Sequence, residues 1–188
     1  FFILVYFAIF MCGINGFNFT DKALIHKMNK LLNHRGPDSQ GEYVDSNVSL
    51  GHTRLSIIDL TSAGNQPMPN EDESVWIVYN GEVYNFKELR NNFKRKYQFK
   101  SETDTEVLIH LYDEYGKEML PMLNGMFAFC LYDSNKKQLF LARDRTGVKP
   151  LYYYFDGDKF IFSSEIKAIL AHEMPRAINK GALAFYLM

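Results

Sequence analysis

The sequence predicts an α+β fold in which antiparallel β-sheets carry helices on their outer faces. Strand-like segments follow one another in runs, and they do not alternate one by one with helices. Turn residues at 133–135 (Asp-Ser-Asn) and 156–157 (Asp-Gly) separate two pairs of these segments, so neighbouring strands can pair as hairpins. Parallel strands need a long crossover connection, which such short turns cannot supply, so antiparallel pairing is favoured.

The first part of the chain contains one helix among short strands. Residues 12–18 have the composition of a strand. Thr20-Asp21 then offers an N-cap, and apolar residues recur between 24 and 32 with the period of a helix. The Arg-Gly-Pro-Asp sequence at 35–38 ends this helix. Further strands are predicted at 41–44, 48–58 and 75–79.

The middle of the chain contains two helices followed by four strands. One helix starts at Asn85, with Glu88 as its capping-box partner. A second helix spans about 105–115, and Gly116 stops it. The four strands are predicted at 126–132, 138–143, 151–155 and 160–163.

Three stretches of the chain are expected to differ in organisation. Residues 12–170 form the domain, which ends with a short helix capped by Ser164-Glu165. Residues 171–188 become irregular and indicate a linker to a further domain. Residues 1–11 contain ten apolar positions in a row, too few to span a bilayer and without the basic start of a signal peptide. They represent either a hydrophobic leader or translation upstream of a true start at Met11.

Composition excludes several classes of function. The 188 residues are 47% hydrophobic and 23% charged, which fits one globular domain with its own core. A net charge of −1 favours neither nucleic acid nor an anionic membrane, so small molecules and protein surfaces are the expected partners. Two cysteines and five scattered histidines form neither a disulfide framework nor a metal-ligand spacing. We therefore expect no metal, two free thiols and a cytoplasmic location.

Four short segments carry residue types that attack on an amide would need. A thiol at Cys12 is a nucleophile once a base has taken its proton. Asn80-Gly81 can aim a side-chain amide and a backbone N–H at one oxyanion. Arg54 can hold a carboxylate, and the carboxylates of Glu82 and Asp104 can receive an ammonium group. Taken singly, each feature is more typical of core packing, a tight turn or a surface ion pair.

The residue sequences of several motifs and their order along the chain are much more specific than these single features. They include Met-Cys-Gly-Ile at 11–14, His-Arg-Gly-Pro-Asp at 34–38, Gly-His-Thr-Arg-Leu-Ser at 51–56, Asn-Gly-Glu-Val-Tyr-Asn at 80–85, Lys-Pro-Leu-Tyr-Tyr at 149–153 and Ser-Glu-Ile-Lys-Ala at 164–168. As a set they resemble the class II glutamine amidotransferases, which belong to the N-terminal-nucleophile hydrolases. Within that group the text is most similar to the glutaminase half of glutamine-dependent asparagine synthetases. The resemblance covers about 11–188.

The resemblance implies a fold and a nucleophile. The fold is a four-layer sandwich, with two antiparallel β-sheets flanked by helices. Cys12 becomes the first residue of the mature chain, and its free α-amino group acts as general base for its own thiol. The thiol attacks the side-chain carboxamide of glutamine, ammonia leaves, and water releases glutamate. The side chain of Asn80 and the backbone N–H of Gly81 form the oxyanion hole.

The resemblance also implies how glutamine is held and what receives the ammonia. Arg54 binds the α-carboxylate of glutamine, and Asp104 and Glu82 bind its α-ammonium group. The glutaminase half needs no cofactor or metal. ATP and magnesium are expected only with a C-terminal synthetase domain of the full-length chain, which makes asparagine from aspartate and carries a Ser-Gly-Gly-x-Asp-Ser type of motif that this sequence lacks. Whether two copies form a homodimer stays open.

Two alternative functions remain open for this chain. The chain could be the glutaminase domain of another class II amidotransferase, or a non-catalytic binding domain of the same fold. Retention of all six site residues argues against the second alternative.

Cys130 lies in an apolar run and is predicted to pack in the core. His34 and His52 lie in matched segments without an acid–base role, so they are interpreted as structural. Because a free amine is needed at Cys12, the resemblance favours a start at Met11.

Overall fold

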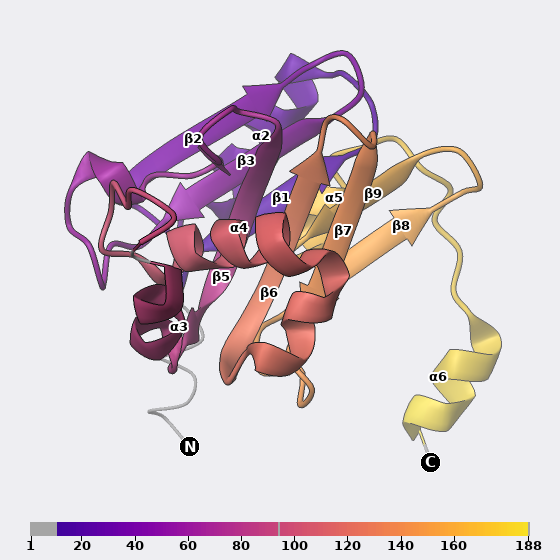
Figure 1. Ribbon diagram of the computed structural model, residues 1–188. Coiled ribbons are helices and arrows are strands. Elements are labelled where there is room, and N and C mark those ends of the chain that lie inside the picture. Colours follow the sequence, from indigo (N-terminus) through magenta and orange to yellow (C-terminus); the bar gives the residue numbers. More distant parts are fainter. Residues whose placement is uncertain (1–10, 94, 188) are drawn as a thin grey trace.

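Two antiparallel β-sheets stack face to face, with helices on both outer faces (Figure 1). The computed structural model describes residues 11–93 and 95–187, so the expectation for the apolar segment 1–10 lies outside the described residues. This four-layer arrangement confirms the predicted α+β sandwich. Among the described residues, no helix combines the length and the apolar character that crossing a membrane requires.

The first sheet has five strands in the order β2-β3-β1-β9-β8. Their bounds are Gly13–Phe17 (β1), Ser39–Val44 (β2), Ser49–Arg54 (β3), Tyr152–Phe155 (β8) and Phe160–Ser163 (β9). The central strand β1 pairs with β3 on one side and with β9 on the other. Cys12 immediately precedes this central strand, so the sheet fixes the backbone that presents its thiol.

The second sheet has four strands in the order β4-β5-β6-β7. Their bounds are Met68–Pro69 (β4), Val75–Val83 (β5), Gly125–Asp133 (β6) and Gln138–Arg143 (β7). Strand β5 pairs with β6 over its whole length, from Val75 opposite Asp133 to Val83 opposite Gly125. It therefore continues beyond the predicted end at Tyr79, and Asn80-Gly81 lies within a strand instead of a turn.

Helices cover the outer faces of both sheets. The α-helices are Lys22–Leu32 (α2), Phe86–Phe93 (α3), Asp104–Tyr115 (α4), Ile166–Ile169 (α5) and Lys180–Leu187 (α6), and 3₁₀ helices span Ser62–Gly64 (η1) and Gly116–Met122 (η2). The predicted cap of α2 is formed by Asp21, whose side chain accepts a hydrogen bond from the N–H of Leu24 over 2.8 Å. Helix α6, within the predicted linker, lies apart from the sheets in Figure 1 and all its described side chains are exposed.

Three apolar clusters hold the four layers together. The cluster between the two sheets includes Ile14, Leu50 and Cys130, none of which is exposed to solvent. A second cluster joins α3 and α4 to the sheet of β5 and β6. A third joins α2 and α5 to the sheet of β1 and β9. Both faces of each sheet are thus buried, one against the other sheet and one under helices.

Two further local predictions were wrong, each for a visible reason. The strand predicted at 48–58 ends at Arg54, because the chain then leaves the sheet and folds back over the Arg54 side chain. Asn85 precedes α3 but does not form the capping box predicted with Glu88. Its side chain instead donates to the backbone oxygen of Met122 over 2.9 Å and accepts from the N–H of Asn124 over 3.1 Å.

Candidate active site

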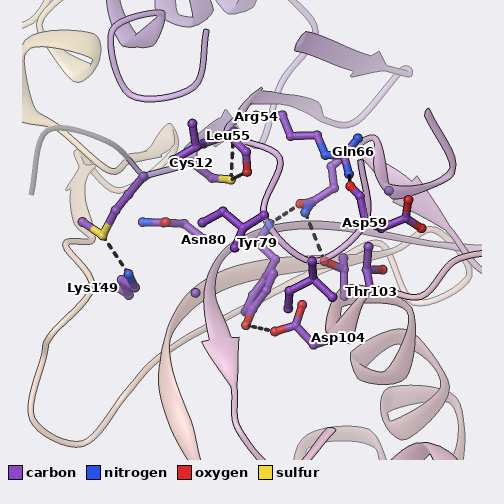
Figure 2. Close-up of a pocket in the computed structure, with 16 residues that line it drawn as sticks. Cys12, Arg54, Leu55, Asp59, Gln66, Tyr79, Asn80, Thr103, Asp104 and Lys149 are labelled. Atoms are coloured by element: carbon purple, nitrogen blue, oxygen red, sulfur yellow. Dashed lines mark hydrogen bonds between the residues drawn. The ribbon is translucent and has the colours of Figure 1, made fainter. Parts of the chain in front are cut away.

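One pocket at the edge of the sandwich brings together five of the six predicted site residues (Figure 2). Four structural elements contribute to its wall. They supply the residue before β1 (Cys12), the end of β3 (Arg54), the middle of β5 (Asn80 and Gly81) and the start of α4 (Asp104). The sixth residue, Glu82, follows on β5 but is exposed and does not line this pocket.

The thiol of Cys12 is half-buried and lies against the backbone of Leu55, the residue that follows β3. Its Sγ accepts from the N–H of Leu55 over 3.4 Å and lies 3.6 Å from the backbone oxygen of Leu55. Burial raises the pKa of Cys12 above its ordinary value, against smaller lowering effects of the Leu55 N–H and of the charges on Arg54 and Lys149. The thiol is therefore protonated near pH 7, and nucleophilic attack by Cys12 requires a base.

Asn80 offers a hydrogen-bond donor that has no other use. Its side chain is 1% exposed, and its Nδ2 has no hydrogen-bond partner among residues 11–93 and 95–187. Figure 2 shows this amide beside Cys12. A buried donor without a partner is costly, so such a group indicates a place that a ligand oxygen completes.

Glycine is required at position 81. A Cβ atom there would overlap the backbone oxygen of Met126 and would lie 2.8 Å from the Cα of Phe127 on β6. The tight pairing of β5 with β6 thus leaves no room for a side chain. Gly81 also lines the pocket together with Asn80, as an oxyanion hole of these two groups needs.

The guanidinium group of Arg54 is held by the loop that follows β3. Its Nη1 donates to the backbone oxygen of Thr61 over 2.6 Å and to Oδ1 of Asn65 over 2.9 Å, and its Nη2 donates to the backbone oxygen of Asp59. A Cβ atom at Gly64 would overlap Nη2, so glycine lets the loop approach. This fixed cation faces the pocket that Cys12 also lines.

Asp104 places a buried carboxylate at the other end of the pocket. Its Oδ2 accepts from the hydroxyl of Tyr79 over 2.6 Å and from the N–H of Val83 over 2.9 Å. Burial raises the pKa of Asp104, although these two donors act in the opposite direction. Arg54 and Asp104 give the pocket opposite charges at separate points, which suits a zwitterionic amino acid.

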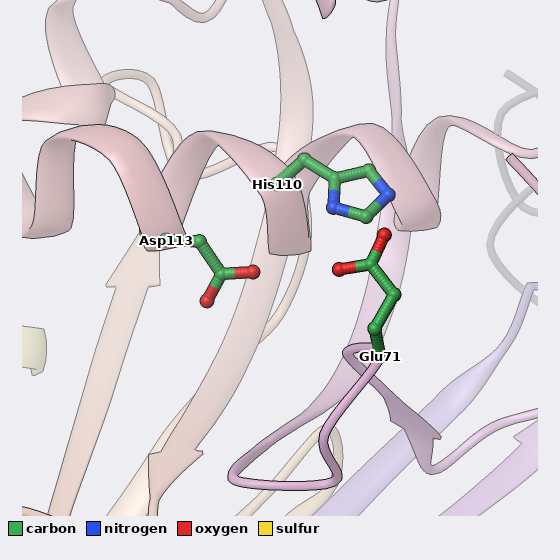
Figure 3. Close-up of side chains that lie close together, drawn as sticks. All are labelled: Glu71, His110 and Asp113. Atoms are coloured by element: carbon green, nitrogen blue, oxygen red, sulfur yellow. The ribbon is translucent and has the colours of Figure 1, made fainter. Parts of the chain in front are cut away.

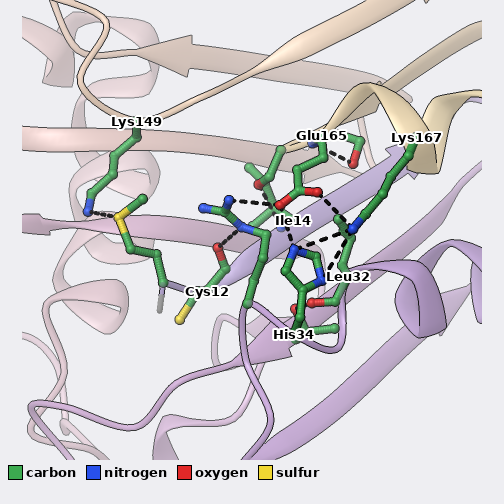
Figure 4. A network of polar contacts seen from close by, with 12 residues as sticks. Cys12, Ile14, Leu32, His34, Lys149, Glu165 and Lys167 are labelled. Carbon is green, nitrogen blue, oxygen red and sulfur yellow. Dashed lines mark hydrogen bonds and ion pairs between the residues drawn. The ribbon is translucent and has the colours of Figure 1, made fainter. Parts of the chain in front are cut away.

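Sequence reasoning missed the residues that hold the backbone of Cys12 (Figure 4). Arg35 is 4% exposed, and it donates from Nε to the backbone oxygen of Cys12 over 3.2 Å and from Nη1 to Glu165 over 3.0 Å. On β1, the N–H of Ile14 donates to the hydroxyl of Ser164 over 3.0 Å. Both Arg35 and Glu165 lie in motifs that carry the family resemblance, which is the signal that could have identified them.

Lys149 lines the pocket, and the sequence analysis did not predict it. Its side chain is 5% exposed, and its Nζ lies 2.7 Å from Sδ of Met11 (Figure 4). Burial lowers the pKa of Lys149, while Cys12 acts in the opposite direction. It belongs to the Lys-Pro-Leu-Tyr-Tyr motif at 149–153, which carries the family resemblance and is the signal that could have identified it.

The three residues interpreted as structural do not line the pocket. Cys130 is fully buried on β6, and burial raises its pKa well above the ordinary value. His52 is 1% exposed on β3 with its Nε2 3.2 Å from the backbone oxygen of Tyr79, and burial lowers its pKa to about 3. His34 lies outside the pocket, where its Nε2 is 2.8 Å from Glu165.

Comparison with known proteins agrees with this geometry. Residues 11–188 match the family described as "Glutamine amidotransferase domain". A putative asparagine synthetase [glutamine-hydrolyzing] 2 of Methanocaldococcus jannaschii is 43% identical over 94% of this chain, which spans 39% of that protein. Asparagine synthetase [glutamine-hydrolyzing] 1 of Bacillus subtilis is also 43% identical over 94% of this chain, which spans 29% of that protein. The chain therefore spans less than half the length of these relatives.

A solved structure supports the fold independently. The glutamine phosphoribosylpyrophosphate amidotransferase of B. subtilis, complexed with ADP and GMP, superposes with a TM-score of 0.71. The match covers 85% of this chain and 43% of that chain at 22% sequence identity, so it bears on the fold alone. The family match, the two relatives and the predicted motifs agree: the chain belongs to the glutamine amidotransferase domain family.

Proposed function

We propose that this chain hydrolyses glutamine to glutamate and ammonia with Cys12 as the nucleophile. The observation that carries the proposal is the buried, unpartnered Nδ2 of Asn80 beside Cys12 in the pocket. Attack of a thiolate on a carboxamide turns the carbonyl oxygen into an oxyanion, which needs a preorganised donor. The Nδ2 of Asn80 and the N–H of Gly81 supply two such donors.

The steps balance if the α-amino group of Cys12 is free. The amine takes the thiol proton, Sγ bonds to the side-chain carbonyl carbon of glutamine, and the amine then gives the proton to the departing nitrogen as ammonia leaves. Water adds to the thioester, and its breakdown returns the thiol and releases glutamate. We propose that removal of Met11 frees this amine, because the burial that raises the pKa of the Cys12 thiol makes a base necessary.

The two ends of glutamine are assigned by charge. Arg54 receives the α-carboxylate, and Asp104 receives the α-ammonium group at the other end of the pocket. Glu82 contributes to the negative potential at that end, since its charge also raises the pKa of Asp104. Because Glu82 is exposed and lies outside the pocket wall, its contribution is electrostatic.

We propose further that the ammonia serves asparagine synthesis. Two relatives with 43% identity are named glutamine-hydrolysing asparagine synthetases, and they extend well beyond the region that this chain matches. A synthetase domain of the full-length protein, using ATP and magnesium to activate aspartate, is the proposed acceptor. The cytoplasm is the proposed compartment, because the mechanism needs Cys12 as a reduced thiol.

The test is a product assay on the chain expressed from Met11. Intact mass is expected to show Cys12 as the first residue, and incubation with glutamine is expected to yield glutamate and ammonia in equal amounts. Aspartate and magnesium-ATP are added in a parallel reaction, where we expect neither AMP nor asparagine from this shortened chain. Full glutaminase activity in a protein that retains Met11 would refute the amine as the base. Asparagine or AMP in the parallel reaction would refute the assignment of synthesis to a further domain.

A further inference from the structure

Three possible metal ligands converge on the outer face of the second sheet, away from the pocket. His110 and Asp113 lie one turn apart on α4, and Glu71 lies in the turn between β4 and β5. One ligand atom from each side chain lies within 4.8 Å of the other two. Figure 3 shows the imidazole and both carboxylates facing a common space.

His110 is the residue that makes this cluster more than a group of surface acids. Its side chain is 3% exposed, and neither ring nitrogen finds a hydrogen-bond partner in the part of the chain that the structure describes. The ring is fixed by stacking on Tyr97 at 4.0 Å between centroids and by an edge contact with Phe99 at 4.9 Å. Because two buried nitrogens without partners are costly, a ligand that binds one of them would be favoured.

The charges around His110 also favour a cation. The carboxylates of Glu71, Asp72 and Glu114 act on Asp113 by their charge, and Arg90 is the opposing positive charge that acts on His110. A hydrogen bond from Nδ2 of Asn70 over 3.3 Å orients the Asp113 carboxylate. Such a set of carboxylates gains stability when a positive charge is placed between them.

The geometry also leaves the imidazole able to act as a ligand. A neutral imidazole has one ring nitrogen with a lone pair to donate. A protonated His110 that forms ion pairs with Glu71 and Asp113 is the competing explanation, but in the described part of the chain neither ring nitrogen lies within hydrogen-bond distance of a carboxylate oxygen.

We propose that Glu71, His110 and Asp113 bind one divalent transition-metal ion, with zinc as the matching element. Imidazole nitrogen combined with carboxylate oxygen suits zinc, whereas magnesium and calcium prefer oxygen alone. At zinc–ligand distances of about 2.1 Å, tetrahedral ligand atoms lie about 3.4 Å apart. The farthest pair of ligand atoms must approach by at most about 1.4 Å to reach that spacing, and Glu71 is exposed on a turn.

The ion would join the β4–β5 turn to α4. His110 lies six residues after Asp104 on the same helix, or about 9 Å along its axis. The proposed ion therefore fastens the helix that carries an acidic residue of the pocket, without touching the pocket. A water molecule would complete the tetrahedron on the exposed side.

The test titrates the full chain with zinc and with cobalt. The protein carries Cys12→Ala, so that the pocket thiol does not compete for metal, and it has no polyhistidine tag. After treatment with a chelator, calorimetry with Zn²⁺ is expected to show one equivalent bound, and Co²⁺ is expected to give visible absorption bands of a four-coordinate ion. Millimolar magnesium should leave both signals in place.

Matched variants locate the site. Glu71→Gln removes an exposed ligand without disturbing the core, and His110→Phe keeps the aromatic contacts while removing both nitrogens. Both variants are expected to lose the binding step, whereas Glu118→Gln, the same change at an exposed glutamate on η2, keeps it. Absence of binding, or equal binding in all these proteins, overturns the proposal. If His110→Phe does not fold, Glu71→Gln decides alone.

Discussion

Arg35 fixes the backbone of the proposed nucleophile: its Nε donates to the carbonyl oxygen of Cys12 over 3.2 Å. The same guanidinium group donates to Glu165 over 3.0 Å, so the arginine is anchored between the start of β1 and the start of α5. Because it is 4% exposed, water cannot easily replace these contacts. The direction of the thiol and of the α-amine of Cys12 thus depends on a residue that does not touch glutamine.

The substitution Arg35→Gln should therefore reduce kcat, while the substrate glutamine still binds. A misplacement of reacting groups by about 1 Å can cost on the order of a hundredfold in rate, and we expect a loss of up to that size. Steady-state kinetics of Arg35→Gln measures it, with the exposed Arg145→Gln as the control for loss of one positive charge. An unchanged kcat would mean that Leu55 and β1 position Cys12 without Arg35.

Cys12→Ala should abolish glutamine hydrolysis and leave glutamine binding intact. The nucleophile is lost, but Arg54 and Asp104 remain in the pocket. Calorimetric titration with glutamine checks binding, and glutamate release checks turnover. Cys130→Ala is the matched control, because this thiol is fully buried between the sheets and should affect stability by about 1 kcal/mol and turnover very little. Activity that follows Cys130 instead would move the nucleophile there.

Asn80→Ala and Arg54→Ala should affect different kinetic constants. Asn80 supplies a donor to the oxyanion, so its loss should lower kcat by on the order of a hundredfold or more. Arg54 holds a carboxylate that is charged in both ground and transition states, so its loss should mainly raise KM.

The Arg54 result needs a control for the loop that its side chain also holds. Asn65→Ala removes one contact of Arg54 with that loop and leaves the guanidinium group in place. We expect its KM to stay close to that of the unmodified chain. A large rise in KM for Asn65→Ala would show that loop order, rather than the carboxylate contact, explains Arg54→Ala.

Tyr79→Phe should move the pH dependence of glutamine binding upward. Burial already raises the pKa of Asp104, and the Tyr79 hydroxyl counteracts that rise by donating over 2.6 Å. Without the hydroxyl the pKa rises further, so the carboxylate that attracts the α-ammonium group is protonated at a higher pH. Affinity should therefore fall earlier as the pH decreases.

Calorimetry of glutamine binding from about pH 4 to about pH 8 measures this shift. The titrations use Cys12→Ala protein with and without Tyr79→Phe, so that no glutamine is consumed. Coincident pH profiles for the two proteins would contradict a role of Asp104 in binding the ammonium group.

Local sequence rules predicted the elements whose contacts are local. The cap at Asp21 depends on an N–H three residues away, and the burial of Cys130 follows from its apolar run. The capping box at Asn85 failed because its side chain binds backbone groups of residues 122 and 124, almost forty positions later. The end of the strand at Arg54 depends on loop carbonyls that bind its guanidinium group. The Asn85 contacts are too distant for a local pattern to encode, and the Arg54 contacts with residues 59 and 61 depend on a loop that folds back on the strand end.

The same distinction holds for the sites. Motif wording found Cys12, Arg54, Asn80 and Asp104, and the structure places all four in one pocket, while their catalytic roles stay predictions. Arg35 was missed because its importance lies in one contact with a backbone oxygen. The group of Glu71, His110 and Asp113 was missed because Glu71 lies in a turn 39 residues before His110, so no spacing rule applies.

The unequal access of the two cysteines has a practical consequence for enzymology. Cys12 is half-buried in an open pocket, whereas Cys130 is sealed between the sheets. A thiol reagent added to native protein should therefore consume one equivalent, and unfolding in denaturant should release a second. In a preparation whose chains all begin at Cys12, the first equivalent counts folded molecules with an accessible nucleophile, so specific activities can be expressed per site instead of per milligram.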